Sequence, residues 1–147
     1  MKLKEYLDKK YTVEEQINLI NLDCSDKGIT SLEGIEVLVN LKELYCSSNK
    51  LTSLKGMEGL VNLKKLDCWN NKLTSLKGIE NLDKLEYLDC RGNKLTSLKG
   101  IENLDKLEIL SCHNNPLPYS DLFNFSKIKL ELIKEIRQEK IQKMLLL

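Results

Sequence analysis

The sequence lacks any long hydrophobic run, and no stretch approaches the roughly 18 apolar residues that a membrane-spanning helix needs. The opening residues, MKLKEYLDKK, carry charge with no apolar segment behind them, so they do not resemble a secretory signal peptide. An excess of one charge is also missing, because 23 Lys and Arg offset 22 Asp and Glu to leave +1. Proteins that bind nucleic acid usually carry a strongly basic face. We therefore expect no nucleic-acid partner and no membrane partner.

The cysteines do not form the even-numbered set of a small disulfide framework. Each lies 22 residues after the previous one, at Cys24, Cys46, Cys68, Cys90 and Cys112. This spacing indicates one apolar column of reduced thiols and predicts a cytoplasmic location. A soft metal is the alternative ligand for such a column. Thiols between leucine columns are usually inert packing, so we expect no metal and no cofactor.

The 22-residue period extends over the whole central sequence. Residues 63–84 read LKKLDCWNNKLTSLKGIENLDK and residues 85–106 read LEYLDCRGNKLTSLKGIENLDK, with four differences. Self-similarity at this period is typical of a solenoid of stacked units. Five copies start at equivalent leucines, at Leu19, Leu41, Leu63, Leu85 and Leu107.

Each copy contains one strand and one short return segment. The alternation around Leu44-Tyr45-Cys46 predicts a strand with one buried face, so five strands should lie parallel and in register. The return segments are about ten residues long and contain glycine, which predicts 3₁₀ or one-turn helices. An asparagine that should bond the backbone of neighbouring loops recurs at Asn49, Asn71, Asn93 and Asn115.

The second copy, LKELYCSSNKL, fits the pattern L-x-x-L-x-[L/C]-x-x-N-x-L and so resembles the leucine-rich repeat family. Its length is most similar to that of the internalins and of a Ser/Thr phosphatase regulatory subunit. The resemblance implies an α/β fold, a right-handed solenoid with a parallel β-sheet on its concave face and short helices on its convex face. It also implies a protein-binding role, a regulatory subunit being one form of it.

Helical caps are predicted at both ends of a single domain, at residues 1–18 and 128–147, around five repeats at residues 19–127, because bare terminal repeats expose the core. Thr12 and Glu15 have the spacing of a capping box. The helix that they begin should turn Val13, Gln16 and Ile17 toward the first repeat.

A C-terminal helix is expected from about Lys127 to Met144, with Ser126 as its N-cap. The predicted apolar side consists of Leu130, Ile133, Ile136, Ile141 and Met144. We interpret this helix as a cap on a monomeric protein. The alternative is a scaffold or assembly role in which the helix docks to a partner or mediates weak self-association.

The concave face is the predicted protein-binding surface. Aromatic and arginine side chains, which dominate binding hot spots, should lie at its centre with two acids and the single histidine around them: Tyr45, Asp67, Trp69, Tyr87, Asp89, Arg91 and His113. Differences between the two closest copies also fall on or beside this face, at positions 64/86, 65/87, 69/91 and 70/92, whereas exposed convex positions are unchanged. We interpret this as separate tuning of the face.

The remaining chemistry of the face favours binding over catalysis. Asp67 and Asp89 should be solvated neighbours on adjacent strands, and either Arg91 or a basic group of a ligand can relieve their repulsion. A metal site is the less supported alternative, because only Asp23 extends this column of acids and Tyr45 interrupts it. His113 lacks a predicted nucleophile and orienting group within hydrogen-bond reach. We therefore expect no enzymatic activity and a protein partner.

Overall fold

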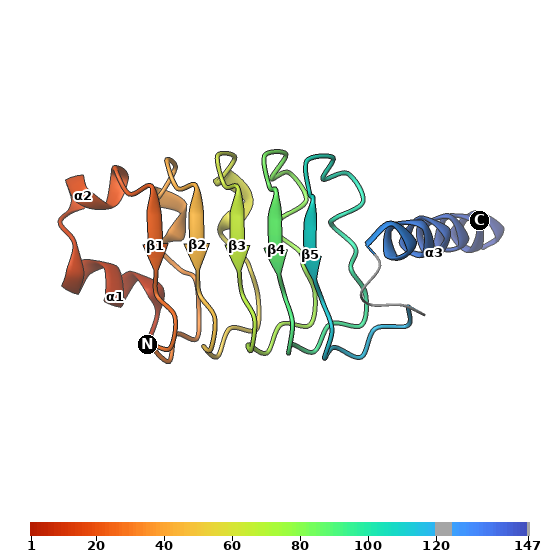
Figure 1. Cartoon of the computed structure of the whole chain (residues 1–147), viewed down its shortest axis with the longest axis horizontal. Coiled ribbons are helices and arrows are strands. Elements are labelled where there is room, and N and C mark those ends of the chain that lie inside the picture. Colours follow the sequence, from red (N-terminus) through yellow and green to blue (C-terminus); the bar gives the residue numbers. More distant parts are fainter. Residues whose placement is uncertain (120–124, 147) are drawn as a thin grey trace.

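The computed structural model describes residues 1–119 and 125–146 of the chain. A single parallel sheet runs along it (Figure 1), built from β1 (Asn21–Asp23), β2 (Glu43–Tyr45), β3 (Lys65–Asp67), β4 (Tyr87–Asp89) and β5 (Ile109–Ser111). The strands lie side by side in chain order, and Leu22, Leu44 and Leu66 occupy matched positions in the register. The predicted solenoid with in-register strands is confirmed.

The predicted 3₁₀ helices are present in the first two return segments, while the later ones are turns. The first two contain the 3₁₀ helices η1 (Ile35–Val37) and η2 (Met57–Gly59). The third return segment is a turn, but it keeps the i to i+3 hydrogen bond of the first two, since Leu82 N donates to Ile79 O at 3.0 Å. Each segment begins at a glycine with a positive φ, which reaches 113° at Gly78. A Cβ there would lie 2.7 Å from Leu54 O, so both the conformation and the space require glycine.

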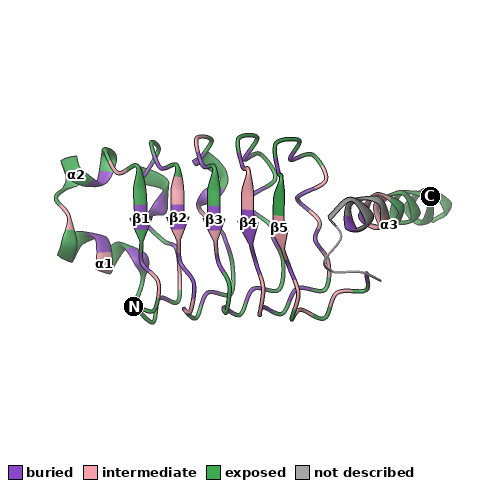
Figure 2. Cartoon of the chain, in the orientation of Figure 1, coloured by how far each residue is buried: buried purple, intermediate pink, exposed green. Residues whose placement is uncertain are grey.

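The core is a set of apolar columns between the strands and the return segments. Residues that recur every 22 positions are almost completely buried, including Leu44, Leu66 and Leu88 at the centres of the strands. Figure 2 shows this repetition from one coil to the next. All five cysteines are free and buried, which confirms the predicted apolar thiol column.

The asparagine column closes the backbone at one edge of the core. Asn71 Nδ2 donates to Cys46 O at 3.0 Å and to Cys68 O at 3.1 Å, and Asn71 Oδ1 accepts from Leu51 N at 3.0 Å. Each shared carbonyl also accepts from the next asparagine, because Asn49 Nδ2 donates to Cys46 O and Asn93 Nδ2 donates to Cys68 O. The predicted ladder of amides is confirmed and continuous.

The N-terminal end is covered by α1 (Leu3–Lys10) and α2 (Val13–Ile17). The capping box at Thr12 is present. The predicted orientation of α2 is wrong for Val13 and Ile17, which are 73% and 45% exposed. The five-residue helix turns only Gln16 inward, where its amide donates to Tyr11 O at 3.2 Å and thus holds α2 against α1.

The C-terminal helix, α3 (Phe125–Leu145), begins two residues earlier than predicted. Ile128 and Leu132 are buried, whereas Ile141 and Met144 are 48% and 73% exposed. Figure 1 shows α3 running on from the solenoid instead of lying across its end, and Figure 2 shows its last turns exposed. Only the first half of α3 therefore packs as a cap.

Other predictions for this region are partly tested. Ile133 and Ile136, on the predicted apolar side, are half-buried. Ser126 is the second residue of α3, so its predicted role as the N-cap is wrong. The side chains of Ser126 and Leu130 lie outside the described residues.

Candidate binding surface on the sheet

The outward-facing side chains of the sheet form three rows that run across the strands. The first row lies at the strand starts and contains Asn21, Glu43, Lys65, Tyr87 and Ile109. The second lies at the strand ends and contains Asp23, Tyr45, Asp67, Asp89 and Ser111. The third, just beyond the strands, contains Ser25, Ser47, Trp69, Arg91 and His113. The seven residues predicted to form the site lie in these rows, on or just beyond β2 to β5.

Asp89 and Arg91 form the strongest polar contact of the face. Arg91 Nε donates to Asp89 Oδ1 at 2.8 Å, and Arg91 Nη2 donates to Asp89 Oδ2 at 2.5 Å. The Asp89 side chain is only 1% exposed, so the prediction that both acids are solvated is wrong here. A bidentate guanidinium neutralises the carboxylate and permits its burial, and Asp89 raises the pKa of Arg91.

Asp67 lies next to Asp89 on the adjacent strand and has no such partner. Its Oδ1 accepts from Trp69 N at 3.2 Å. Burial raises the pKa of Asp67, and the neighbouring charge of Asp89 raises it further, while Arg91 lowers it. Within residues 1–119 and 125–146, no cationic nitrogen forms an ion pair with this carboxylate. Arg91, which was predicted to relieve the repulsion between the two acids, thus pairs with Asp89 and affects Asp67 less.

The two tyrosines are half-buried and partly held by neighbours. Tyr45 Oη donates to Glu43 Oε2 at 2.8 Å, and Glu43 Oε1 also lies 3.3 Å from Lys65 Nζ. The pKa of Tyr45 is raised chiefly by its bond to Glu43, whereas burial is the largest cause of the raised pKa of Tyr87. Tyr45 of the second row is therefore held by Glu43 of the first row, which also pairs with Lys65.

A cleft of about 320 Å³ lies at the third row. Its sides are formed by three predicted site residues and by the turn residues that follow them: Trp69, Asn70, Arg91, Gly92, His113 and Asn114. Trp69 is 39% exposed, an unusual state for the single tryptophan of the chain. The structure thus brings Trp69, Arg91 and His113 together around one concavity.

Two of the four differences between the closest copies have structural explanations. Asn70 and Gly92 both have positive φ, 54° and 61°, a conformation that favours these residue types. Lys64 and Glu86 pair across adjacent repeats, with Nζ and Oε1 3.0 Å apart. Only the differences at positions 65/87 and 69/91 therefore remain as changes of the face itself.

Part of the constancy of the convex side is also structural. Glu80 Oε2 accepts from Gly78 N at 2.7 Å, and Glu102 Oε2 accepts from Gly100 N at 2.6 Å. These glutamates bond the backbone at the start of each return turn. They are therefore the same in both copies for a structural reason, and they say nothing about how freely the exposed convex residues change. The contrast between the two surfaces is weaker than the sequence indicated.

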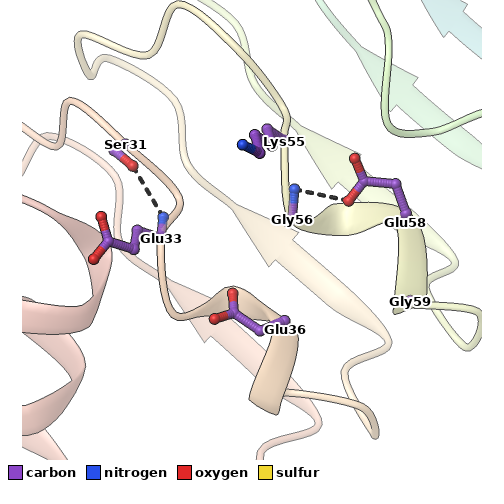
Figure 3. Close-up of a pocket in the computed structure, with 7 residues that line it drawn as sticks. All are labelled: Ser31, Glu33, Glu36, Lys55, Gly56, Glu58 and Gly59. Atoms are coloured by element: carbon purple, nitrogen blue, oxygen red, sulfur yellow. Dashed lines mark hydrogen bonds between the residues drawn. The ribbon is translucent and has the colours of Figure 1, made fainter.

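A larger cleft, of about 620 Å³, lies between the first two return segments (Figure 3) and was missed by sequence reasoning. The sequence feature that could have pointed to this cleft is Glu33, which occupies the position of Lys55 and Lys77 in later copies. The polar groups around it serve the local structure: Glu58 Oε2 accepts from Gly56 N at 2.8 Å. Glu33 Oε2 also pairs with Lys2 Nζ at 2.8 Å. Glu58 and Glu33 of this cleft are thus already engaged by local partners.

The buried cysteines show no activated thiol among the described residues. Burial raises the pKa of all five, to about 12 for Cys24 and about 11 for Cys112. Because the thiolate is the reactive form, such thiols are poor nucleophiles. In the described part of the chain, no group of three or more His, Cys, Asp or Glu side chains is placed to hold a metal ion.

Comparison with known proteins gives matches along most of the chain. The family model described as Leucine Rich repeats (2 copies) matches residues 17–60, 61–102 and 83–127. No curated protein matches the chain. Among the helices that the structure describes, none is long and apolar enough to span a bilayer.

Several solved structures are similar. The functional domain of InlJ from Listeria monocytogenes, which includes a cysteine ladder, is 38% identical, with a TM-score of 0.69 over 80% of this chain. A leucine-rich repeat protein of Leptospira interrogans is 32% identical, with a TM-score of 0.57 over 73% of this chain. The internalin InlF of Listeria monocytogenes is 21% identical, with a TM-score of 0.65 over 86% of this chain, and shares the fold. The chain spans only 25%, 35% and 44% of these proteins, respectively.

Proposed function

The chain belongs to the leucine-rich repeat family, and from this premise we propose that it binds another protein through the concave face of its sheet. The fold is a general protein–protein interaction module. The proposed contact residues are those predicted from the sequence: Tyr45, Asp67, Trp69, Tyr87, Asp89, Arg91 and His113. The proposed role is non-enzymatic.

The observation that carries the proposal is the cleft formed by Trp69, Arg91 and His113. Tryptophan, tyrosine and arginine are the residues most enriched at binding hot spots, which lie in well-packed pockets. Here an exposed indole and a fixed guanidinium lie beside a concavity on a rigid sheet. Such a surface loses little conformational entropy when a partner docks.

The size of the sheet limits the contact. Five strands about 4.8 Å apart give a surface roughly 24 Å wide, and about 16 Å of strand length is usable. The resulting area of roughly 400 Å² is half of the ~800 Å² that each partner contributes to a standard interface. We therefore expect the partner to contact the loops at the ends of the strands as well.

The test compares capture of proteins from native lysate by matched variants. Trp69→Ala with His113→Ala alters the cleft, whereas Lys55→Glu with Lys77→Glu changes exposed residues of the return segments. Arg91 is left intact, because its removal would leave the buried Asp89 uncompensated. Loss of a partner with the first pair only supports the concave face, provided that circular dichroism shows equal folding. Equal loss with both pairs contradicts it.

A second candidate function is assembly through α3, favoured by the exposure of its last turns. Ile141, Met144, Leu145 and Leu146 are 48% to 85% exposed.

The competing proposal is a monomer in which residues 1–18 and 128–147 cap the repeats at residues 19–127. Light scattering at high concentration separates the two roles: a dimer that Met144→Glu dissociates would favour assembly, and one-chain mass would favour the cap.

We also propose a cytoplasmic location, supported by five free thiols at one repeated position. Disulfides are rare in the reducing cytosol. Fractionation of the tagged protein from its native cells tests this location directly.

A further inference from the structure

Two of the acids near the centre of the concave face, Asp89 and Glu43, are paired with cations of the described residues, whereas Asp67 is not. Arg91 neutralises Asp89, and Lys65 lies 3.3 Å from Glu43. Within the described residues, Asp67, in the middle strand of the five, accepts a hydrogen bond from the Trp69 backbone N–H and forms no ion pair. It is half-buried, so water screens its charge less than that of an exposed carboxylate.

Three aromatic side chains border this carboxylate. Tyr45 is its register partner on β2, and Tyr87 lies on β4 as the register partner of Lys65. Trp69 lies two residues after Asp67, just beyond the end of β3, and its backbone N–H donates to Asp67 Oδ1 at 3.2 Å. The carboxylate therefore lies near three aromatic side chains, a residue type whose ring faces attract cations.

The local field is negative. The charges of Asp67 and Asp89 both contribute to the raised pKa of Tyr87, and Asp67 contributes to that of Tyr45. Asp23, in the same row, adds to the field at Asp67 itself. A positive group placed over Asp67 would gain chiefly from Asp67 itself, because Arg91 offsets the charge of Asp89. A neutral group would desolvate the carboxylate without compensation.

On the basis of the proposed concave-face function, we infer that Asp67 is the recognition point for a cationic side chain, arginine or lysine, that the partner protein inserts among Tyr45, Trp69 and Tyr87. The carboxylate supplies the charge contact, and the aromatic rings supply cation–π contacts. A single unpaired carboxylate suits an organic cation better than calcium, which takes six to eight oxygen ligands.

The experiment titrates the ¹⁵N-labelled protein with two matched peptides, Ac-Gly-Arg-Gly-NH₂ and its citrulline counterpart, which has the same shape but no charge. The arginine peptide should shift the Trp69 indole signal and the amide signals of β2–β4 in a saturable way. The citrulline peptide should bind on the order of fivefold more weakly. Equal binding of the two peptides, or no binding by the arginine peptide, overturns the inference.

Two variants localise the effect. Asp67→Asn should weaken arginine-peptide binding about as much as citrulline does, while Asp83→Asn, the same change on an exposed return segment, should leave it unchanged. Asp67→Asn removes a repulsion and should remain folded, as the unchanged signals of β1 and β5 would show. Equal effects of the two variants would identify a general charge effect and overturn the site.

The two proposals fail separately. If Trp69→Ala with His113→Ala abolishes partner capture but Asp67→Asn does not, the concave face stands and the cation site is wrong. If the arginine peptide binds at Asp67 but capture is insensitive to both variants, the site exists and the face is not the partner surface. In addition, peptide binding should weaken as falling pH protonates Asp67.

Discussion

Replacing Asn71 with alanine tests the physical basis of the stacked coils most directly. This side chain joins two adjacent repeats, and its residue is 8% exposed. Its Oδ1 is the acceptor for Leu51 N, and its Nδ2 donates to the carbonyls of Cys46 and Cys68. A further contact, to Trp69 O at 3.4 Å, is too long to add much.

The size of the loss follows from which groups remain bonded. Leu51 N loses its side-chain acceptor, and an unpaired buried donor costs about 1–3 kcal/mol. The two carbonyls each keep a bond from a neighbouring asparagine, Asn49 or Asn93, so each loses only about 0.5 kcal/mol. The sum is about 2–4 kcal/mol, a large share of the ~5–15 kcal/mol that stabilises a typical domain.

The assay is urea denaturation followed by far-ultraviolet circular dichroism. Asn115→Ala should cost only about 1 kcal/mol, because Asn115 is half-buried and water can replace its bonds. Lys72→Ala, at an exposed neighbouring position, should change stability by less than about 0.5 kcal/mol. A loss for Asn71→Ala no greater than that for Asn115→Ala would refute the reasoning.

A double variant adds an independent check. When Asn71 and Asn93 are both replaced, Cys68 O loses both of its asparagine donors. The combined loss should therefore exceed the sum of the single losses by about 1 kcal/mol, a coupling that distant, independent sites do not show. Strict additivity would contradict the shared-carbonyl arrangement.

Three further predictions concern other parts of the fold. Cys68 should react with a thiol reagent only after urea unfolding, since the thiol is buried and its pKa is raised. If Cys68 of the folded protein reacted as fast as an exposed thiol, the coil register would be wrong. Gly78→Ala should cost about 2 kcal/mol or more in urea denaturation, because its φ is 113° and the new Cβ meets Leu54 O, whereas Gly59→Ala, with no atom within 4 Å, should be nearly neutral. Asp67→Asn should raise the melting temperature at pH 7. Because the pKa of Asp67 is raised in the folded state, the charged carboxylate destabilises the fold as pH rises through that pKa, and asparagine removes this cost. The gain should vanish below the ordinary pKa of 3.8, and a gain that does not depend on pH would contradict this cause.

Much of the architecture was predictable because one pattern occurs several times. A single copy with Leu44 and Cys46 facing inward is ambiguous, but copies at a constant 22-residue spacing must stack in register if each is to bury the same side. The asparagine ladder follows from the same argument, since an amide at a fixed position in every coil meets the same backbone groups. Both predictions depend on periodicity and need no knowledge of distant contacts.

The ends of the chain and the pairing of charges were less predictable, because no repetition constrains them. Val13 and Ile17 had suitable spacing to face the first repeat, yet both are exposed, and Gln16, the buried side chain of α2, bonds to α1 and to the residue after it. The second half of α3 has an apolar side that no described residue of this chain covers, although its spacing resembles that of a packed helix. Amphipathic spacing reports that a helix has an apolar side, and the neighbours alone determine whether that side is buried.

The amino-acid order is sufficient to specify the coil, its 22-residue length, the inward leucines and thiols, and which residues share the outer face of the sheet, because these follow from local alternation repeated at a constant interval. Which acid is buried is a different matter. Asp67 and Asp89 occupy equivalent positions in nearly identical copies. Only the packed arrangement reveals that Arg91 folds onto Asp89, while no cation of the described residues pairs with Asp67. The reason is physical: a charge pair depends on distances and on exclusion of water, both of which exist only once the coils are stacked.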